Sequence, residues 1–267
     1  IVSIINPTIN ASPGIIKKLP TPDDNDTISM IVEQNISISK QDWDAHETSW
    51  DFERNPLYEQ FLECMEDDLQ NVIPSGTSLE ELSKYAVAEA MHPLTTCMHN
   101  YKDKWEMNFM RLHKNEEELN RQFIDIYGLQ DELTPDVPLN EITVLQQGEI
   151  SIENDRIKWH DDVVMKQFIS YAVGCIMGRY SIDKPGLILA NQGDGVNEYN
   201  EKVPNSRFDV DDDGIIPLMA SDTEFADNAT KRFKQWLAIA FGDIHLVENL
   251  NFIEGALGKS LDDYFVK

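Results

Sequence analysis

The stretch NEEELNRQFIDIYGLQDELTPDVP, residues 115–138, decides the fold because it ends a long amphipathic helix and begins the second half of the chain. Reading backwards from Gly128, apolar side chains recur at steps of three, four or seven residues from Ile126 to Leu94, which places them on one helix face. Prolines flank this stripe at both ends, and Gly128 supplies a left-handed stop. We therefore predict one helix over residues 93–127, about 50 Å long at about 1.5 Å per residue.

A helix of this length exceeds what one small core needs, which favours a strut between two bodies over a long core helix. We predict a mostly α fold with a small β component (α+β). In this fold the strut over residues 93–127 links a helical first half to an α+β second half.

The first half has helix signals throughout, interrupted by one Pro-Ser-Gly break. Thr27 suits the cap of a short helix, and Ser39 followed three residues later by Asp42 gives a weaker start signal. Residues 55–70 show an amphipathic pattern, and residues 78–91 begin with a capping box.

The second half mixes the two periodicities. Apolar and polar residues alternate over short runs between residues 142 and 159, which predicts a small hairpin or meander. Helical spacing follows, with one short strand among the helices. The predicted segments are helices at 161–180, 222–242, 244–253 and 261–265 and a strand at 187–190.

The charge balance is strongly acidic, with 48 acidic and 22 basic residues and a formal net charge of −26. Affinity for duplex DNA comes largely from Lys and Arg that neutralise phosphates, so this segment alone should repel DNA. Either the phosphate-binding surface lies elsewhere in a larger parent polypeptide, or the acidic surface faces a protein partner. Mimicry of DNA has less support, because the acids are scattered among core-forming apolar residues.

Composition also indicates in which cellular compartment the protein lies. No apolar run is long enough to span a membrane, so we expect no membrane partner. The three cysteines, Cys64, Cys97 and Cys175, are far apart and odd in number, which argues against a disulfide framework and predicts a reducing cytoplasm. With 41% hydrophobic residues, the chain can bury a core.

Six ordered runs resemble the adenine-specific DNA methyltransferases of BREX phage-exclusion systems, the PglX family, which are similar to type IIG restriction-modification enzymes. The runs are distributed along nearly the whole chain, from residue 5 to residue 265. They are INPTINASPGIIKKLP (5–20), ISKQDWDAHETSWDFERNPL (38–57), FIDIYGLQDELTPDVP (123–138), ISYAVGCIMGRYSIDKPGL (169–187), DDDGIIPL (211–218) and ENLNFIEGALGKSLDDYF (248–265).

The resemblance implies a parent that transfers the methyl group of S-adenosylmethionine to adenine N6 in a specific double-stranded DNA sequence. It does not cover the catalytic half, so we expect this chain to be a fragment downstream of the catalytic domain, inactive by itself. It also implies three parts. Residues 1–26 are the tail of a recognition domain and a linker, residues 27–138 a helical spacer, and residues 139–267 an α+β C-terminal module.

Three strings within the chain are similar to methyltransferase motifs. NPLY at 55–58 is similar to the Asn-Pro-Pro-Tyr signature that binds a flipped base, but it lacks the second Pro and reads more simply as a helix start. Asn6-Pro7-Thr8-Ile9 is a weaker match. The run 187–195 resembles a strand that feeds a cofactor-binding glycine turn, although no βαβ series surrounds it.

Three further strings resemble metal or phosphate sites. Residues 209–214 match the first half of a calcium loop, but Ala220 stands where a closing Glu is required, which favours an acidic turn. Gly258-Lys-Ser lacks the first glycine of a phosphate loop and indicates a helix boundary. Cys97, His99 and His92 lack further ligands. We therefore assign no catalytic, cofactor-binding or metal residue.

Three hypotheses follow for the chain. The first is a non-catalytic spacer and scaffold of a DNA adenine methyltransferase, which positions recognition and catalytic parts on DNA and docks other phage-defence proteins. The second is a self-sufficient S-adenosylmethionine-dependent methyltransferase with permuted motifs. The third is an acidic protein-interaction module.

The charge generates a direct prediction. The isolated chain should bind duplex DNA weakly or not at all at physiological salt, because its charge opposes phosphate contact. A mobility-shift titration at about 150 mM salt measures this. Submicromolar affinity would contradict it.

Overall fold

The computed structural model describes residues 26–72, 92–219, 225 and 227–266. The strand and linker expected at 1–26 and the helix expected at 78–91 lie outside these residues, apart from Asp26. The described part is mostly helical with one two-stranded sheet, which confirms the predicted fold class.

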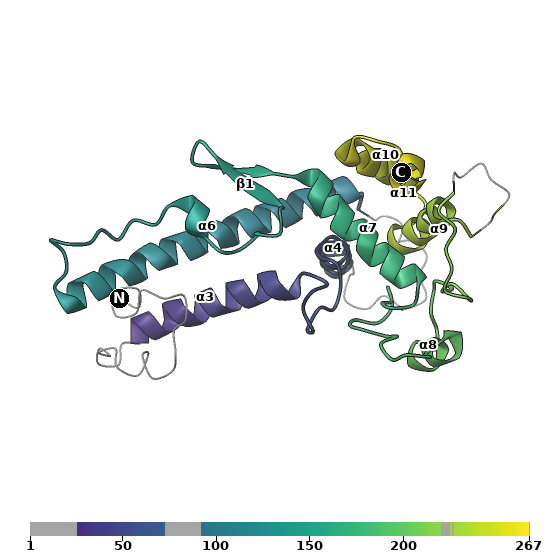
Figure 1. The fold of residues 1–267 in the computed structure, drawn as a ribbon, viewed down its shortest axis with the longest axis horizontal. Helices are drawn as coiled ribbons and strands as arrows, with labels where there is room; N and C mark the ends of the chain where they lie inside the picture. The colour runs from purple at the N-terminus through teal and green to yellow at the C-terminus, as the bar shows by residue number, and fades with distance from the viewer. Residues whose placement is uncertain (1–25, 73–91, 220–224, 226, 267) are drawn as a thin grey trace.

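Eight α-helices, one 3₁₀ turn and two strands make up the described part (Figure 1). In chain order they are α3 (Asp26–Asp44), α4 (Pro56–Val72), α6 (Leu94–Tyr127), η1 (Leu139–Glu141), β1 (Ile150–Glu153), β2 (Arg156–Trp159), α7 (Asp161–Ile176), α8 (Val196–Lys202), α9 (Ala229–Phe241), α10 (Leu246–Leu257) and α11 (Leu261–Val266).

Helix α6 confirms the predicted long helix in length and in both ends. It has 34 residues and stops at Gly128, whose φ of 65° is left-handed; the following N–H of Leu129 donates to the carbonyl of Ile124 at 2.9 Å. At its start the N–H of Leu94 donates at 2.7 Å to Oδ1 of Asn249, which is fully buried in α10. A residue 155 positions away therefore satisfies a backbone donor that no local cap supplies.

The apolar stripe of α6 is buried only over its first half. All six stripe residues up to Leu112 are buried, together with the neighbouring Cys97. The stripe predicted to run to Ile126 is wrong at its end, where Ile126 is 43% exposed and Ile124 is buried instead. The reason is that α6 leaves the main body after Leu112 and from there contacts less of the molecule. The buried residues are Leu94, Cys97, Met98, Tyr101, Trp105, Phe109 and Leu112, followed by Ile124.

The main body, which we call the head, consists of α4, the first half of α6, the hairpin, α7, α9, α10 and α11. Its centre is aromatic: Phe168 lies 5.4 Å from Trp236 and Tyr58 lies 5.8 Å from Phe241, ring centroid to ring centroid. One continuous cluster of buried side chains contains residues from both sides of residue 138. The division into a 27–138 spacer and a 139–267 module stays a prediction.

A second feature, which we call the arm, consists of α3, residues 113–127 of α6 and the segment 129–138. Figure 1 shows α3 running beside the distal part of α6 in the opposite direction. The segment after Gly128 returns along α6: Nε2 of His113 donates to the carbonyl of Val137 at 2.7 Å, and Nδ2 of Asn120 donates to that of Pro135 at 3.2 Å. The chain therefore comes back to the head instead of continuing away from it.

The hairpin confirms the small β component. Strands β1 and β2 pair antiparallel, Ile150 opposite Trp159, and the turn residues Asn154 and Asp155 have φ values of 52° and 55°, as a type I′ turn requires. Residues 142–145 do not join the sheet. Leu145 has a φ of 59°, and its N–H donates to Oδ1 of Asp42 in α3 at 2.9 Å.

Two predicted helix starts are wrong. Helix α3 is continuous from Asp26 to Asp44, so Ser39 lies inside it and caps nothing. Helix α9 begins at Ala229 and not at residue 222, because the side chain of Asn228 accepts the N–H of Lys231 at 3.0 Å and caps the helix there.

Helix α7 ends at Ile176 and not at residue 180. Gly178 turns the chain with a φ of 75°, and the N–H of Arg179 donates to the carbonyl of Gly174 at 2.8 Å. The predicted strand at 187–190 is also wrong, because Ile188 and Leu189 bond to this same turn and join no ladder.

The last two predicted helices exist with shifted bounds. Helix α10 starts at Leu246 and continues to the left-handed Gly258, and α11 follows. Helix α8 was not predicted.

A buried ion pair joins the arm to the head. His46, just after α3, lies 2.6 Å through Nε2 from Oε1 of Glu149, and its Nδ1 donates to the carbonyl of Asp42 at 2.7 Å. Gln167 of α7 donates to the same Glu149 oxygen at 2.6 Å, and the N–H of Gln147 donates to the other at 2.9 Å. His46 is 7% exposed and Glu149 is fully buried, so the network connects three separate segments away from water.

The surroundings of the pair shift the pKa values of both groups. Burial alone would lower the pKa of His46, but the hydrogen bonds to Glu149 and the Asp42 carbonyl outweigh it and raise that pKa. Burial alone would raise the pKa of Glu149, but His46 and Gln167 together lower it. Both shifts favour the imidazolium–carboxylate form.

Replacing Glu149→Gln should lower the free energy of unfolding by about 3 kcal/mol, because it leaves a buried charge without its partner. The stability that comes from the raised pKa of His46 is complete below the ordinary pKa of 6.5. It is lost as the pH rises through the raised pKa. The stability that comes from the lowered pKa of Glu149 is present above the ordinary pKa of 4.5. It is lost as the pH falls through the lowered pKa. The loss on mutation should therefore be largest between about pH 4.5 and 6.5, measured by urea unfolding.

The matched control is Glu153→Gln, which breaks an exposed ion pair with Lys158 of 2.8 Å. It should leave the midpoint nearly unchanged, because exposed pairs contribute little. Equal effects of the two substitutions, or a Glu149→Gln effect that ignores pH, would contradict the role given to the buried pair.

Candidate functional site at the junction of arm and head

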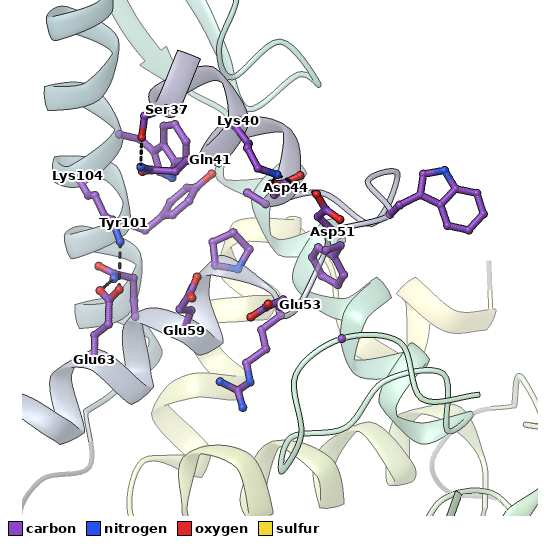
Figure 2. A pocket seen from close by; sticks show the side chains of 18 of the residues that line it. Ser37, Lys40, Gln41, Asp44, Asp51, Glu53, Glu59, Glu63, Tyr101 and Lys104 are labelled. Atoms are coloured by element: carbon purple, nitrogen blue, oxygen red, sulfur yellow. Dashed lines mark hydrogen bonds and ion pairs between the residues drawn. The ribbon is translucent and has the colours of Figure 1, made fainter. Parts of the chain in front are cut away.

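A cleft of about 810 Å³ lies where the arm meets the head (Figure 2). Its walls come from α3, the segment after it, the start of α4, the first half of α6 and the loop at 186–187. Most of its lining is polar or charged, over a floor of buried aromatic rings. The lining residues are Ser37, Lys40, Gln41, Asp44, Ala45, Trp50, Asp51, Phe52, Glu53, Arg54, Pro56, Glu59, Gln60, Glu63, Tyr101, Lys104, Trp105, Gly186 and Leu187.

Two lysines in the cleft already have partners. Lys40 lies 2.6 Å from Asp44 and 2.9 Å from Asp51, and Lys104 lies 3.2 Å from Glu63. Figure 2 shows the contact between Lys104 of α6 and Glu63 of α4. The pairs are solvated, so they fix side-chain positions more than they stabilise the fold.

Two acids in the cleft are different. Within the described residues no hydrogen bond or ion pair reaches the carboxylates of Glu53 and Glu59. Burial raises the pKa of Glu59, Lys104 opposes the rise, and Glu63 adds to it. The lining contains neither histidine nor cysteine, so the cleft offers sites for a polar or cationic group and no nucleophile with a neighbouring imidazole base.

The NPLY string borders this cleft and has a structural task. Oδ1 of Asn55 accepts the N–H of Leu57 at 3.0 Å, which caps α4. The ring of Tyr58 is fully buried, and its hydroxyl donates to the carbonyl of Ile182 at 3.2 Å and accepts from Arg207 at 3.2 Å. Burial raises the pKa of Tyr58. A ring in this position cannot stack on a flipped base, so the geometry favours the helix-start interpretation.

The glycine turn at 193–195 is filled by its own neighbours. The carboxylate of Glu198 accepts the N–H of Gly195 at 2.8 Å, and Asp194 pairs with Lys202 at 3.1 Å. The preceding residues form no strand. The turn therefore lacks the strand that a cofactor loop needs, and the N–H groups of Asp194 and Gly195 already have acceptors within it.

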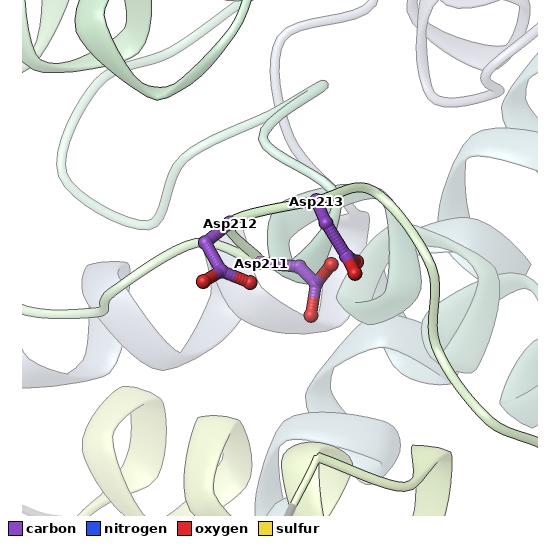
Figure 3. Close-up of side chains that lie close together, drawn as sticks. All are labelled: Asp211, Asp212 and Asp213. Atoms are coloured by element: carbon purple, nitrogen blue, oxygen red, sulfur yellow. The ribbon is translucent and has the colours of Figure 1, made fainter.

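Asp211, Asp212 and Asp213 lie together in one turn (Figure 3), with ligand oxygens within 4.8 Å of one another. Two of these carboxylates face the backbone, because the N–H of Ile215 donates to Asp211 at 3.0 Å and to Asp213 at 2.8 Å. Gly214 has a φ of 72°, which completes the turn. This arrangement favours the acidic turn over a calcium loop.

The other metal-like and phosphate-like strings are not assembled into sites. Cys97 is buried in the core, which raises the pKa of its thiol to about 12, whereas the side chain of His99 is 74% exposed beside Asp103. Gly258 is the left-handed cap of α10, and Ser260 accepts the N–H of Asp263 at 3.1 Å. Asn6-Pro7-Thr8-Ile9 lies outside the described residues.

Sequence reasoning missed the cleft and the His46–Glu149 network. Both depend on residues far apart in the chain: His46 and Glu149 are separated by 103 positions. The only signal in the sequence is a polar residue surrounded by apolar ones, and this signal does not show which residue is its partner.

In the described part, no helix has the length and hydropathy needed to cross a membrane.

Comparison with known proteins gives two matches that extend over nearly all of this chain. The chain is 31% identical over 259 residues to the adenine-specific methyltransferase BrxX of Escherichia coli O9:H4 (strain HS), covering 96% of this chain and 19% of that protein. It is 33% identical over 264 residues to the adenine-specific methyltransferase PglX of Lacticaseibacillus casei (strain Zhang), covering 98% and 18%. No protein-family model matches. The chain is thus homologous to one region of these methyltransferases and spans about a fifth of their length.

The role of Asn55 as a cap is testable by unfolding. Asn55→Ala should cost about 1 kcal/mol of stability because α4 loses its side-chain acceptor, whereas Asn55→Ser should cost only a fraction of that because a hydroxyl also caps. Chemical denaturation of both variants measures the difference. If the alanine and serine variants unfold at the same denaturant concentration, the capping explanation of NPLY fails.

Proposed function

We propose that the chain is a non-catalytic spacer and scaffold segment of a longer DNA adenine-N6 methyltransferase of a BREX or restriction-modification system. The observation that carries the proposal is the match of nearly the whole chain to about a fifth of two adenine-specific methyltransferases. In this proposal the parent polypeptide binds S-adenosylmethionine and double-stranded DNA in the cytoplasm. The catalytic residues lie upstream of this segment.

The geometry of the methyltransferase-like strings supports a non-catalytic role. Asn55 caps a helix, Tyr58 is buried, and the N–H of Gly195 is taken by Glu198. These are the residues that a permuted methyltransferase would need to present to cofactor and base. The permuted enzyme remains the alternative and is weakened by each of these contacts.

The shape supports a positioning role. The arm projects from the head as two antiparallel helices, α3 and the distal part of α6 (Figure 1). Polar contacts hold the arm together. Nδ2 of Asn115 in α6 donates to Oδ1 of Asn35 in α3 at 2.8 Å, and Oε1 of Glu117 in α6 accepts the N–H of Val137 in the returning segment at 3.3 Å. A projecting element with aligned sides can set the distance and angle between two other parts of a parent polypeptide.

The charge supports a division of labour. With a net charge of −26 the segment opposes contact with DNA phosphates, so the cationic surface that binds DNA belongs to other parts of the parent polypeptide. The same charge is compatible with an acidic module that docks other phage-defence proteins.

Insertions into α6 test the positioning role in the parent polypeptide. Two alanines after Lys114 would rotate the distal arm helix by about 200° and shift it by about 3 Å, which removes Asn115 from Asn35. Four alanines would rotate it by about 400°, close to the original face. We expect the two-residue insertion to abolish site-specific methylation while S-adenosylmethionine binding survives, and the four-residue insertion to be less harmful.

The control is Met107→Ala, which changes a side chain of α6 that is 68% exposed and should leave methylation unchanged. Methylation that tolerates both insertions equally would show that the arm positions nothing. Loss of cofactor binding on insertion of two alanines would place the segment in the catalytic machinery.

A further inference from the structure

Helix α3 has three faces with different surroundings. One faces α6 and the loop after η1, through Asn35, the buried Ile38 and Asp42. A second lines the cleft through Lys40 and Asp44 and is polar. The third face is apolar and carries three of the exposed large hydrophobic side chains of the described residues.

We call this third face the α3 flank and define it as Val32, Ile36 and Trp43. At about 100° per residue, spacings of four and seven residues place the three side chains within a narrow sector, about a quarter turn from the face that packs on α6. They are 37%, 62% and 58% exposed. A helix exposing a branched aliphatic pair and a tryptophan in line has the pattern of a face that packs against another surface.

The position of the flank indicates what could cover it. It lies on the arm, the part that projects from the head (Figure 1). The relatives are about five times as long as this chain, since the matched region is 18–19% of their length. In such a parent the remaining four fifths are tethered to this segment, and tethering raises their effective concentration at the flank far above that of a separate protein.

The charge of the chain indicates what kind of surface could pack against the α3 flank. The flank is set in a chain of net charge −26. The charged residues of α3 nearest to it are Glu33 and Lys40, and Lys40 is already paired with Asp44 and Asp51. An apolar surface rimmed by Lys or Arg would match both the flank and its acidic surroundings. The same polypeptide must contain cationic surfaces elsewhere if it binds DNA, because the net charge of this segment opposes phosphate contact.

We propose that the α3 flank is the docking face for the remainder of the parent polypeptide, through an apolar surface with a basic rim. This inference rests on the proposed function and adds the surface through which the segment holds the other parts. The contact places the projecting arm, and through it the head, at a fixed angle to the rest of the enzyme.

Cysteine alkylation tests the docking. Ile36→Cys, Trp43→Cys and, as control, Met30→Cys are made both in the 267-residue chain and in the complete polypeptide. Met30 is 60% exposed on the same helix and lies about 120–160° around it from the flank residues. Alkylation by N-ethylmaleimide is followed on the peptide containing each new cysteine, so that Cys64, Cys97 and Cys175 do not contribute.

We expect the two flank positions to react about tenfold or more slowly in the complete polypeptide than in the 267-residue chain, because a covered side chain reacts only when the contact opens. The Met30→Cys variant should react at the same rate in both. Raising the salt concentration should partly relieve the protection, because a basic rim is screened.

Three results would overturn the docking. Equal rates at all positions in both proteins would show that the flank stays open. Slow reaction at Ile36→Cys and Trp43→Cys already in the dilute 267-residue chain would show that its own residues cover the flank. Protection that grows with the concentration of the 267-residue chain would assign the flank to a second copy. None of these results depends on methylation, so the insertion experiment judges the proposed function separately.

Discussion

The buried ion pair between His46 and Glu149 fixes the arm on the head. One member follows α3 and the other precedes the hairpin, and Gln167 of α7 holds the carboxylate in place. A charged pair out of water contributes only when both partners and their hydrogen bonds are complete. Because every position in the network has its partner, the end of α3 has one arrangement relative to the head, and the arm starts from a defined point.

The rest of the architecture follows from where α6 is buried. Up to Leu112 its apolar face lies in the core, and Asn249 of α10 holds its first turn. Beyond that point it is held by α3 and by polar contacts such as His113 with the Val137 carbonyl. The same helix is thus a core element at one end and an exposed support at the other. This combination suits a segment that links parts of a larger enzyme.

The sequence predicted what local periodicity and backbone chemistry determine. The stripe and the glycine stop at Gly128 gave α6, and alternation broken at Asn154 gave the hairpin. The errors have two causes. The predicted stripe runs on to Ile126 because periodicity does not reveal where a helix leaves the core. The predicted start of α9 is too early because apolar spacing does not reveal the local cap at Asn228. The cleft and the His46 network join residues that no sequence spacing relates.

The central claim is that this segment positions a methyltransferase without performing its chemistry. The most direct measurement is calorimetric titration of S-adenosylmethionine into the 267-residue chain and into the complete polypeptide. The account predicts binding by the complete polypeptide and no detectable heat of binding with the 267-residue chain. Micromolar binding by the 267-residue chain would contradict the account and favour a self-sufficient enzyme with permuted motifs.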